Sequence, residues 1–313
     1  MKRFDVVALG EILIDMTYAG KSEAGQTLFE QNPGGAPANV LAAARRLGGE
    51  AAFIGKVGTD MHGTFLRETL QKEGICTEGL LEDDSVFTTL AFVNLDANGD
   101  RSFSFARKPG ADTCLRQEEI NLSLIDNAKI FHVGSLSLTD EPAKSATFYA
   151  LEAAKKSGAI ISYDPNYRAP LWESKEKAIA GMRSVLPYVD IIKISDEETE
   201  LLTGFSDAGQ AAEFLLTYGI SIAIVTLGKD GAYVCTKEGA ITSPAMQVQA
   251  VDTTGAGDAF MGGFLWQLAQ SGKRCEELSL REVQAFADFA NRVSGFCVQK
   301  RGAINAMPRL EQI

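Results

Sequence analysis

Six apolar runs, separated by segments of helical periodicity, are the feature that most constrains the fold of this chain. The runs lack the polar and apolar alternation of a half-exposed strand, which predicts strands that are buried on both faces. An alternation of buried strands and helices predicts a mostly parallel central sheet covered by helices on both faces. The apolar runs are residues 4–9, 51–57, 130–133, 159–163, 189–194 and 222–227, and the helical segments include residues 39–47, 65–73, 143–156 and 208–218.

The composition favours one large domain. The chain has 313 residues, of which 45% are hydrophobic, enough to bury a single large α/β core. Its formal net charge of −11 without a basic run argues against nucleic acid or a membrane as a partner. Acidic residues interrupt the apolar N-terminal run, so neither a signal peptide nor a transmembrane span is predicted. Five scattered cysteines suit reduced thiols, so we expect a cytoplasmic protein without a zinc site.

One region departs from the alternation of strands and helices. Residues 88–95 and 101–107 alternate in hydrophobicity around a turn sequence at residues 96–99, which predicts an antiparallel hairpin. We interpret this hairpin as part of a lid over a binding site. A hairpin at a solvent-facing sheet edge is the alternative interpretation.

The segment from Asp252 to Phe260 connects an apolar strand to an apolar helix through two glycines and two carboxylates. Gly255 and Gly257 let successive amide groups converge on one anion at the positive end of the helix. Asp258 lies in the first helical turn, where it could deprotonate a hydroxyl group that attacks a bound phosphate. The segment therefore predicts a phosphoryl-transfer centre. A glycine-containing turn capped by an acidic residue is the alternative.

Two common nucleotide-binding motifs do not fit the chain. The Gly20-Lys21-Ser22 sequence has the end of a P-loop, but Asp15 stands where the first glycine of that motif belongs. A dinucleotide fingerprint fails near residue 257, because Phe260 takes the place of its third glycine.

Several motifs, in order along almost the whole chain, resemble those of the ribokinase-like (PfkB) family of carbohydrate kinases. The N-terminal signature is residues 33–39 (PGGAPAN) followed by 55–58 (GKVG), and the C-terminal one is residues 252–260. Residues 10–15, 33–39, 53–58, 162–166 and 251–260 are most similar to fructokinases within that family. The resemblance implies a ribokinase-like three-layer sandwich, one domain over residues 1–313, and a small β lid from segments near 11–34 and 88–107.

The resemblance implies a role for each residue around the transfer centre. Asp258 would be the general base that takes a proton from the attacking sugar hydroxyl. The amides of Gly255, Ala256 and Gly257 would hold the transferring phosphoryl group. Other residues would read sugar hydroxyls or let the backbone approach the sugar closely. These sugar-facing residues are Asp15, Gly34, Gly35 and Asn39. From residue type alone, Asp15 could instead be a solvated acid at a strand end, and Asn39 could be a residue that starts a helix.

Arg107 and Arg168 match places where related sequences carry arginines that face the substrate or its phosphate. Arg107 ends the second strand of the hairpin. Arg168 follows the apolar run 159–163, at a strand end where ligands collect in open α/β sheets. A surface salt bridge is the alternative for each arginine.

ATP and metal ions also enter through the resemblance. Glu198 would organise Mg²⁺ through water, although Ser195 replaces the asparagine of the family motif and leaves that contact open. For residues 195–198, the alternative is that the acids only open a helix. For residues 226–231, the alternative is a strand-to-strand turn. The residues expected to bind the nucleotide are Ser195, Thr226, Gly228, Gly231 and Asn291. Positions that bind a monovalent cation in the family, with K⁺ suited to them, are Asp252, Thr254, Cys297, Lys300 and Gly302.

We therefore expect an ATP-dependent sugar kinase, a fructokinase that transfers the γ-phosphate of ATP to the 6-hydroxyl of D-fructose. A 2-keto-3-deoxygluconate kinase or a ribonucleoside-type kinase of the same fold is the alternative. A catalytically silent binding protein is disfavoured because the base and the anion loop are both present, and an NAD-dependent oxidoreductase because the dinucleotide fingerprint is missing. The lid often mediates dimerisation in the resembled family, so a homodimer through the lid is one expected assembly.

Overall fold

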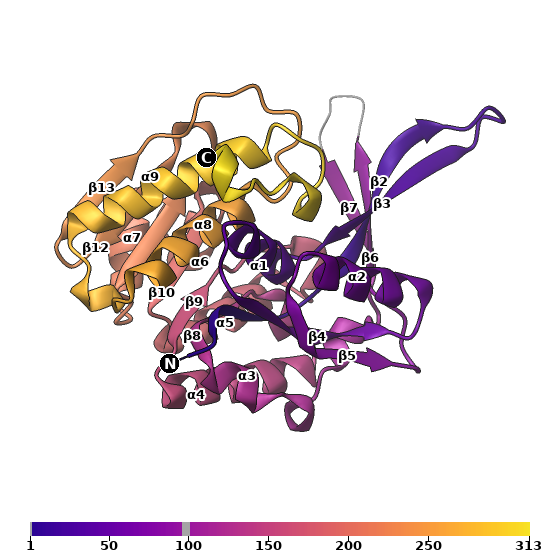
Figure 1. Cartoon of the computed structure of the whole chain (residues 1–313), viewed down its shortest axis with the longest axis horizontal. Coiled ribbons are helices and arrows are strands. Elements are labelled where there is room, and N and C mark those ends of the chain that lie inside the picture. Colours follow the sequence, from indigo (N-terminus) through magenta and orange to yellow (C-terminus); the bar gives the residue numbers. More distant parts are fainter. Residues whose placement is uncertain (1, 96–100) are drawn as a thin grey trace.

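The structure, a computed structural model, describes residues 2–95 and 101–313, and in that part of the chain a nine-stranded sheet forms the centre (Figure 1). The strand order is β13-β12-β11-β10-β9-β8-β1-β4-β5, and neighbours are parallel from β11 to β5. This confirms the mostly parallel sheet. The strands are β1 (Phe4–Leu9), β4 (Ala51–Gly58), β5 (Cys76–Asp83), β8 (Ala128–Val133), β9 (Ile160–Tyr163), β10 (Ile191–Ser195), β11 (Ile222–Thr226), β12 (Ala232–Thr236) and β13 (Gly239–Ser243).

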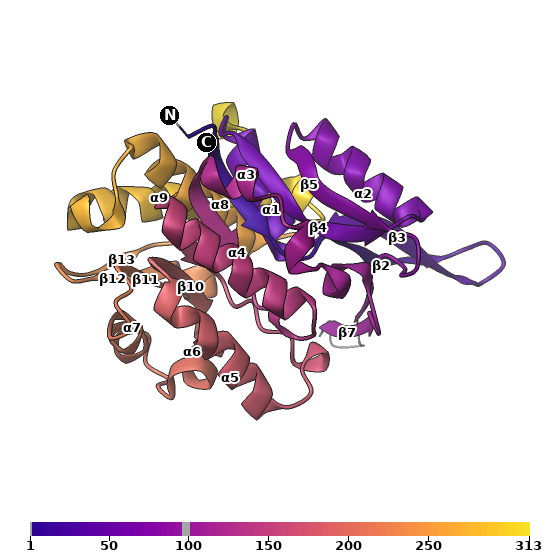
Figure 2. The same cartoon turned by 90° about the horizontal axis from the view of Figure 1, so that it is seen from below.

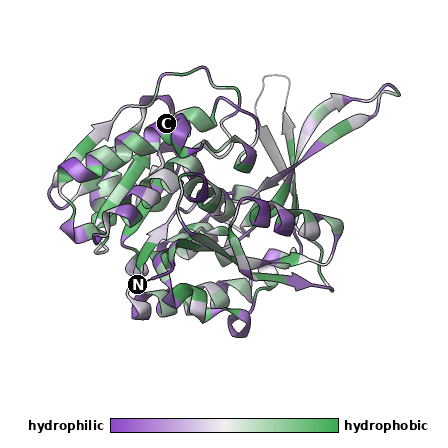
Figure 3. Cartoon of the chain, viewed as in Figure 1, coloured by the Kyte–Doolittle hydropathy of each residue, from purple (hydrophilic) through white to green (hydrophobic). Residues whose placement is uncertain are grey.

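Helices cover both faces of this sheet, as Figures 1 and 2 show. Alternate side chains of β1 enter two separate cores, with Val6 and Ala8 on one face and Val7 and Leu9 on the other. The apolar residues along the central strands in Figure 3 therefore have partners on each side. The first face carries α1 (Ala36–Arg46), α2 (Met61–Lys72), α8 (Ala256–Ser271) and α9 (Leu280–Cys297), and the second carries α3 (Leu122–Asp126), α4 (Ala143–Ser157), α5 (Lys175–Val185), α6 (Asp196–Thr203) and α7 (Ala208–Leu216).

A smaller four-stranded sheet forms the lid, in the order β3-β2-β6-β7. Strands β6 (Leu90–Leu95) and β7 (Arg101–Ala106) pair antiparallel, which confirms the predicted hairpin, while its turn at residues 96–99 lies outside the described residues. Strand β2 (Leu13–Lys21) pairs antiparallel with β3 (Thr27–Gly34) and parallel with β6. The β2–β3 ribbon projects away from the body of the molecule (Figure 1).

Several elements differ from the sequence expectation for physical reasons. Helix α1 starts at Ala36, three residues before the predicted start, since Pro37 fits the first helical turn and needs no amide hydrogen there. Strands β5 and β13 lie at the two edges of the sheet and are only partly buried, so they lack a continuous apolar run, and the short strand β12 lies between β13 and β11. Across the described ranges, no helix has the length and apolar character needed to cross a bilayer.

Candidate active site

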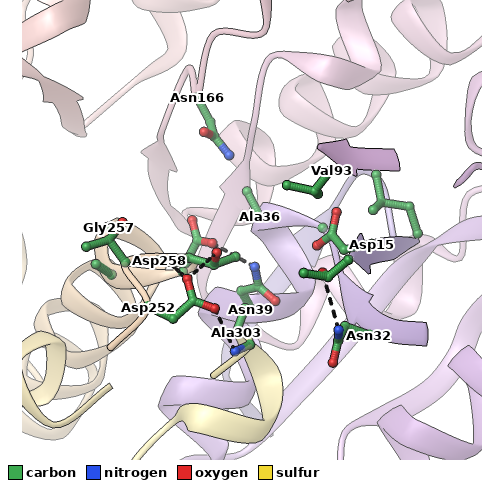
Figure 4. A pocket seen from close by; sticks show the side chains of 18 of the residues that line it. Asp15, Asn32, Ala36, Asn39, Val93, Asn166, Asp252, Gly257, Asp258 and Ala303 are labelled. Atoms are coloured by element: carbon green, nitrogen blue, oxygen red, sulfur yellow. Dashed lines mark hydrogen bonds between the residues drawn. The ribbon is translucent and has the colours of Figure 1, made fainter. Parts of the chain in front are cut away.

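A cavity of about 350 Å³ lies between the lid, the start of α8 and the carboxyl ends of central strands (Figure 4). This volume falls within the range of small-molecule sites, and strand carboxyl ends are where open α/β sheets bind ligands. The cavity brings together most of the residues that the sequence analysis selects. From that set, its lining includes Asp15, Gly35, Asn39, Arg168, Asp252, Thr254, Gly255, Ala256, Gly257, Asp258 and Gly302.

Helix α8 begins at the glycine-containing loop as predicted. Gly255 caps the helix with a φ of 76°, a left-handed conformation that favours glycine, and a Cβ atom there would lie 2.7 Å from the Cβ of Ala303. Gly257 lies in the first turn, where its lack of a side chain leaves room for the Lys193 ammonium group. The positive end of α8 therefore opens into the cavity with little side-chain bulk.

The amide of Ala256 does not point freely into the cavity in this structure. Its N–H donates to the carbonyl oxygen of Thr253 at 3.2 Å. An anion at the loop would have to share this amide with Thr253 or displace the carbonyl group. The Gly255 and Gly257 amides are accordingly the stronger candidates for an anion-binding pair.

Asp258, like Glu11, is a carboxyl group of the cavity whose pKa is raised. It is buried, and its Oδ2 accepts a 2.7 Å hydrogen bond from the Asn39 side-chain amide (Figure 4). Burial raises the pKa of Asp258 to about 6, helped by the charge of Asp164 and opposed by Lys193, Asn39 and Arg168. A carboxylate with a pKa near neutrality is suited to take and return a proton at physiological pH.

The residues predicted to face the sugar lie on β2, at the end of β3 and at the start of α1. A Cβ atom at Gly34 would overlap Oδ2 of Asp15, so the glycine makes space for that carboxylate. Gly35 has a φ of 109°, and a Cβ atom there would lie 2.5 Å from the carbonyl oxygen of Glu11. Asn39 follows on α1, with its Oδ1 buried and without a hydrogen-bond partner among the described residues. This arrangement leaves acceptor groups of Asp15 and Asn39 at one cavity.

The structure separates the two arginines. Arg168 lines the cavity, and its Nη1 donates to the Tyr167 carbonyl oxygen at 3.0 Å. Arg107 lies outside that cavity and borders a neighbouring pocket instead. Its Nη2 lies 2.6 Å from Oδ2 of Asp112, and both side chains are only 2% exposed. Because its guanidinium also donates to Thr139 Oγ1 and the Leu136 carbonyl, Arg107 ties the end of β7 to the 136–139 turn that follows β8.

Glu198 closes a capping box at the start of α6. Its Oε2 accepts hydrogen bonds from the Ser195 amide at 2.8 Å and the Ser195 hydroxyl at 3.0 Å. Its Oε1 accepts from the Tyr167 amide at 2.6 Å, which links α6 to the loop after β9. The helix-opening role is therefore present in the structure. Within the described part of the chain, no group of three or more His, Cys, Asp or Glu residues could hold a metal ion.

The residues expected around a monovalent cation form one connected loop cluster. Asp252 accepts hydrogen bonds from the amide and hydroxyl of Thr254 at 2.9 and 2.7 Å, and from the Gly302 amide at 3.0 Å. At the end of α9, the Lys300 amide donates to the Cys297 carbonyl oxygen at 3.2 Å. The bond between Gly302 and Asp252 holds the 252–255 loop against the 300–303 loop, next to the start of α8.

The nucleotide candidates lie beyond the 350 Å³ cavity, at the ends of β10 and β11, in the turn after β11 and on α9. Thr226 ends β11, and its hydroxyl donates to the Ile194 carbonyl at 3.3 Å. Gly228 and Gly231 have left-handed φ values of 55° and 102° in the turn between β11 and β12. The Asn291 side chain is buried and donates to Ser243, which ties α9 to the end of β13.

Sequence reasoning missed two buried charged groups in the site. The Lys193 Nζ lies 2.6 Å from Asp164 Oδ2, and these side chains are 8% and 1% exposed. Lys193 lines the cavity, together with Asn166 and the lid residue Asn32. The signal for Lys193 was available, since a charged residue inside the otherwise apolar run 189–194 needs a buried partner.

Comparison with known proteins identifies the family. The model of the pfkB family of carbohydrate kinases matches residues 3–310. A curated relative, probable fructokinase-5 of Arabidopsis thaliana, is 44% identical over 307 residues, which cover 97% of this chain and 94% of the relative. The chain therefore belongs to the pfkB family and is a carbohydrate kinase.

Two solved structures have the same fold. Fructokinase with bound ATP from Xylella fastidiosa matches with a TM-score of 0.90 and 34% identity, covering 100% of this chain and 97% of that one. A double mutant of fructokinase from Vibrio cholerae O395, with fructose, ADP and potassium ion bound, matches with a TM-score of 0.89 and 30% identity, covering 100% and 98%. These similarities confirm the ribokinase-like α/β fold with its small lid sheet.

Proposed function

We propose that this kinase is an ATP-dependent fructokinase that phosphorylates the 6-hydroxyl of D-fructose. The observation that carries the proposal is the placement of Asp258 at the positive end of α8, in one cavity with Asp15 and Asn39. A proton acceptor, an anion-binding helix end and hydroxyl-reading groups therefore meet within a small-molecule site. The fructokinase names of the curated relative and of both solved structures support fructose as the sugar.

The transfer step follows from this placement. The Asp258 carboxylate takes the proton of the attacking hydroxyl as the new oxygen–phosphorus bond forms, and the bond to the leaving ADP breaks. The Gly255 and Gly257 amides, at the positive end of α8, stabilise the negative charge on the transferring group. Asp15 and Asn39 orient the sugar, because each offers acceptor groups to sugar hydroxyls in the cavity.

ATP extends from this loop toward the turn after β11. In this proposal, Thr226, Gly228 and Gly231 approach the phosphates and ribose, and Ser195 and Asn291 border the nucleotide. The ATP named with the Xylella fastidiosa structure supports a nucleotide on this fold. The hydrogen bonds of Asn291 to Ser243 give it a fixed position rather than a free amide, so its contact with adenine would be through packing.

The carboxylate that fits Mg²⁺ best is that of Glu198. Each of its oxygens has two lone pairs, so one pair of Oε1 is left after the hydrogen bond from Tyr167 and can accept from a metal-bound water. Mg²⁺, when bound, supplies positive charge that neutralises the ATP phosphates.

The 252–254 and 297–302 loops offer carboxylate, hydroxyl and main-chain carbonyl oxygens, a donor set that suits K⁺. The potassium ion named with the Vibrio cholerae structure supports that assignment.

The whole chain acts in this proposal as one cytoplasmic kinase domain, with the lid contributed by segments near 11–34 and 88–107. A homodimer through the lid is the proposed assembly, since the lid exposes Tyr18, Leu28 and Phe29 at 39%, 44% and 42%. Sedimentation of the protein and of a Phe29→Glu variant tests it. A wild-type monomer at micromolar concentration would overturn the dimer.

One observation favours a second candidate function, a 2-keto-3-deoxygluconate kinase. Arg168 lines the cavity and could pair with a substrate carboxylate. The position of Arg107 outside the cavity weakens this candidate, because the two arginines cannot form a clamp on one acid. Measuring ADP release with fructose, ketodeoxygluconate, glucose and a ribonucleoside decides between them. The fructokinase proposal fails if another of these substrates gives a higher kcat/KM than fructose.

A further inference from the structure

Lys193 is a buried charge in the middle of an apolar strand. It lies in β10 between Ile192 and Ile194, which are both fully buried, and is itself 6% exposed. Its ammonium group pairs with Asp164 at 2.6 Å. A buried ion pair is weak evidence for stability, because desolvation of both charges can exceed their mutual attraction. The pair therefore calls for an explanation other than folding.

The position of the ammonium group links Lys193 to the anion loop. A Cβ atom at Gly257 would lie 2.8 Å from Lys193 Nζ, and both residues line the same cavity. Gly257 lies in the first turn of α8, where many residues could adopt the backbone conformation. The absence of a side chain at this position thus serves to let the lysine reach the positive end of the helix.

The charges around Lys193 leave it protonated and surrounded by carboxylates. Burial alone would lower the pKa of Lys193, but the charges of Asp164, Glu198 and Asp258 together raise it above its usual value. The Oδ1 atom of Asp164 is buried and has no hydrogen-bond partner among the described residues. The ammonium group of Lys193 is therefore a fixed positive charge, held in place by Asp164, beside the place where the phosphoryl group would sit.

We propose that Lys193 is a catalytic residue whose ammonium group contacts the transferring phosphoryl group, and that Asp164 is the residue that positions it. This inference rests on the proposed phosphoryl transfer. Lys193 gives up no proton in the step, and Asp258 remains the base. Its charge adds to the two glycine amides, and a lysine in such a position acts as a compact point charge on phosphate oxygens.

The test compares Lys193→Met with Lys56→Met. Lys56 is a matched control because it is also a buried strand lysine, 4% exposed and paired with Glu119, but it does not line the cavity. Rates are compared at about pH 9, because loss of Lys193 also raises the pKa of Asp258 and would otherwise leave the base protonated. We expect kcat to fall about 10²- to 10³-fold for Lys193→Met and to stay within about threefold for Lys56→Met.

Binding measurements distinguish contact with the phosphoryl group from a structural role. In calorimetry, Lys193→Met should weaken the non-hydrolysed ATP analogue AMP-PNP about tenfold more than ADP, since only the former carries the third phosphoryl group. Equal weakening of both nucleotides would overturn the proposal. This binding comparison needs no turnover, so it still applies if fructose is not the substrate. A wild-type enzyme that phosphorylates none of the sugars would contradict the proposed function but not the role of Lys193.

Removing Lys193 alone leaves Asp164 as an uncompensated buried charge, which can prevent folding. The double variant Lys193→Met, Asp164→Asn removes both charges and restores the balance. We expect this variant to unfold at a temperature close to that of the wild type and to keep the loss in kcat. Recovery of kcat to within tenfold of the wild type would show that Lys193 only stabilises the fold.

Discussion

The side-chain amide of Asn39 donates a 2.7 Å hydrogen bond to the carboxylate of Asp258, 219 residues later in the sequence, and so joins the first turns of α1 and α8. Helix α1 carries the asparagine that we propose faces the sugar, and α8 carries the proposed anion loop and the proposed base. The contact sets the distance between the two halves of the site. It also favours the charged form of Asp258, because the amide donates to the carboxylate.

Replacing the base should abolish turnover without removing binding. We expect Asp258→Asn to lower kcat by 10²-fold or more, while the affinities for ATP and fructose stay near those of the wild type, because the amide cannot accept the proton. Steady-state rates and calorimetry measure both effects. Asp207→Asn is the control, since Asp207 caps α7 from an exposed position and asparagine caps equally well. A Asp258→Asn variant with more than about a tenth of the wild-type kcat would contradict the assignment.

The pH dependence of kcat/KM should report the same carboxyl group. Asp258 has a pKa of about 6 and must be ionised to act as a base, so activity should rise with pH around that value and level off above it. The groups that face it are Asp164, which raises its pKa, and Lys193, Asn39 and Arg168, which lower it. Asn39→Ala removes one lowering contact, so the midpoint should move to higher pH. An unchanged midpoint in the variant would refute this link.

The central sheet was predictable because its inner strands are apolar on both faces. The only sign of Lys193 in the sequence was that a charged residue lies within one of these apolar strands. The lysine's role was not predictable, since its partner Asp164 and its neighbour Gly257 are brought together only by tertiary packing. The burial of Arg107 was not predictable either. Its partner Asp112 is five residues away, but sequence spacing does not reveal that the intervening loop folds back to bury the pair.

The buried carboxyl group of Glu11 should lower the free energy of unfolding as pH rises. Burial raises the pKa of Glu11 to about 7, and Asp112 adds to this rise, while Arg107 and the Ala36 amide oppose it. Because the folded pKa exceeds the unfolded one, this group stabilises the fold fully below about pH 4, and the contribution is lost as pH rises through 7. Glu11→Gln should therefore raise the free energy of unfolding by about 2 kcal/mol at pH 8.

Urea unfolding of Glu11→Gln and wild type at both ends of this range provides the measurement. Near pH 4 the glutamate is protonated in both states, so the two proteins should unfold at nearly the same urea concentration. A difference of equal size at pH 4 and pH 8 would mean that the substitution acts through packing and not through charge.

Both metal dependences can be checked by removal. Excess chelator should abolish activity and Mg²⁺ should restore it, because Glu198 with the ATP phosphates provides the expected site. Activity in KCl should exceed that in NaCl at equal ionic strength, owing to the oxygen donors around Asp252. Full activity in chelator would rule out the Mg²⁺ part, and equal rates in the two salts would rule out the K⁺ part.

The choice of sugar depends on what Arg168 does. If Arg168 paired with a substrate carboxylate, ketodeoxygluconate would be preferred, and Arg168→Gln would lower its kcat/KM far more than that of fructose. We predict instead that fructose ranks above ketodeoxygluconate and glucose, because Asp15 and Asn39 give the cavity a hydroxyl-reading wall, and a wrong sugar leaves such groups unpaired. Arg168 then acts on phosphate charge near Asp258, and Arg168→Gln should lower kcat for every sugar by a similar factor. A larger kcat/KM for the acid would reassign the sugar and leave the kinase chemistry intact.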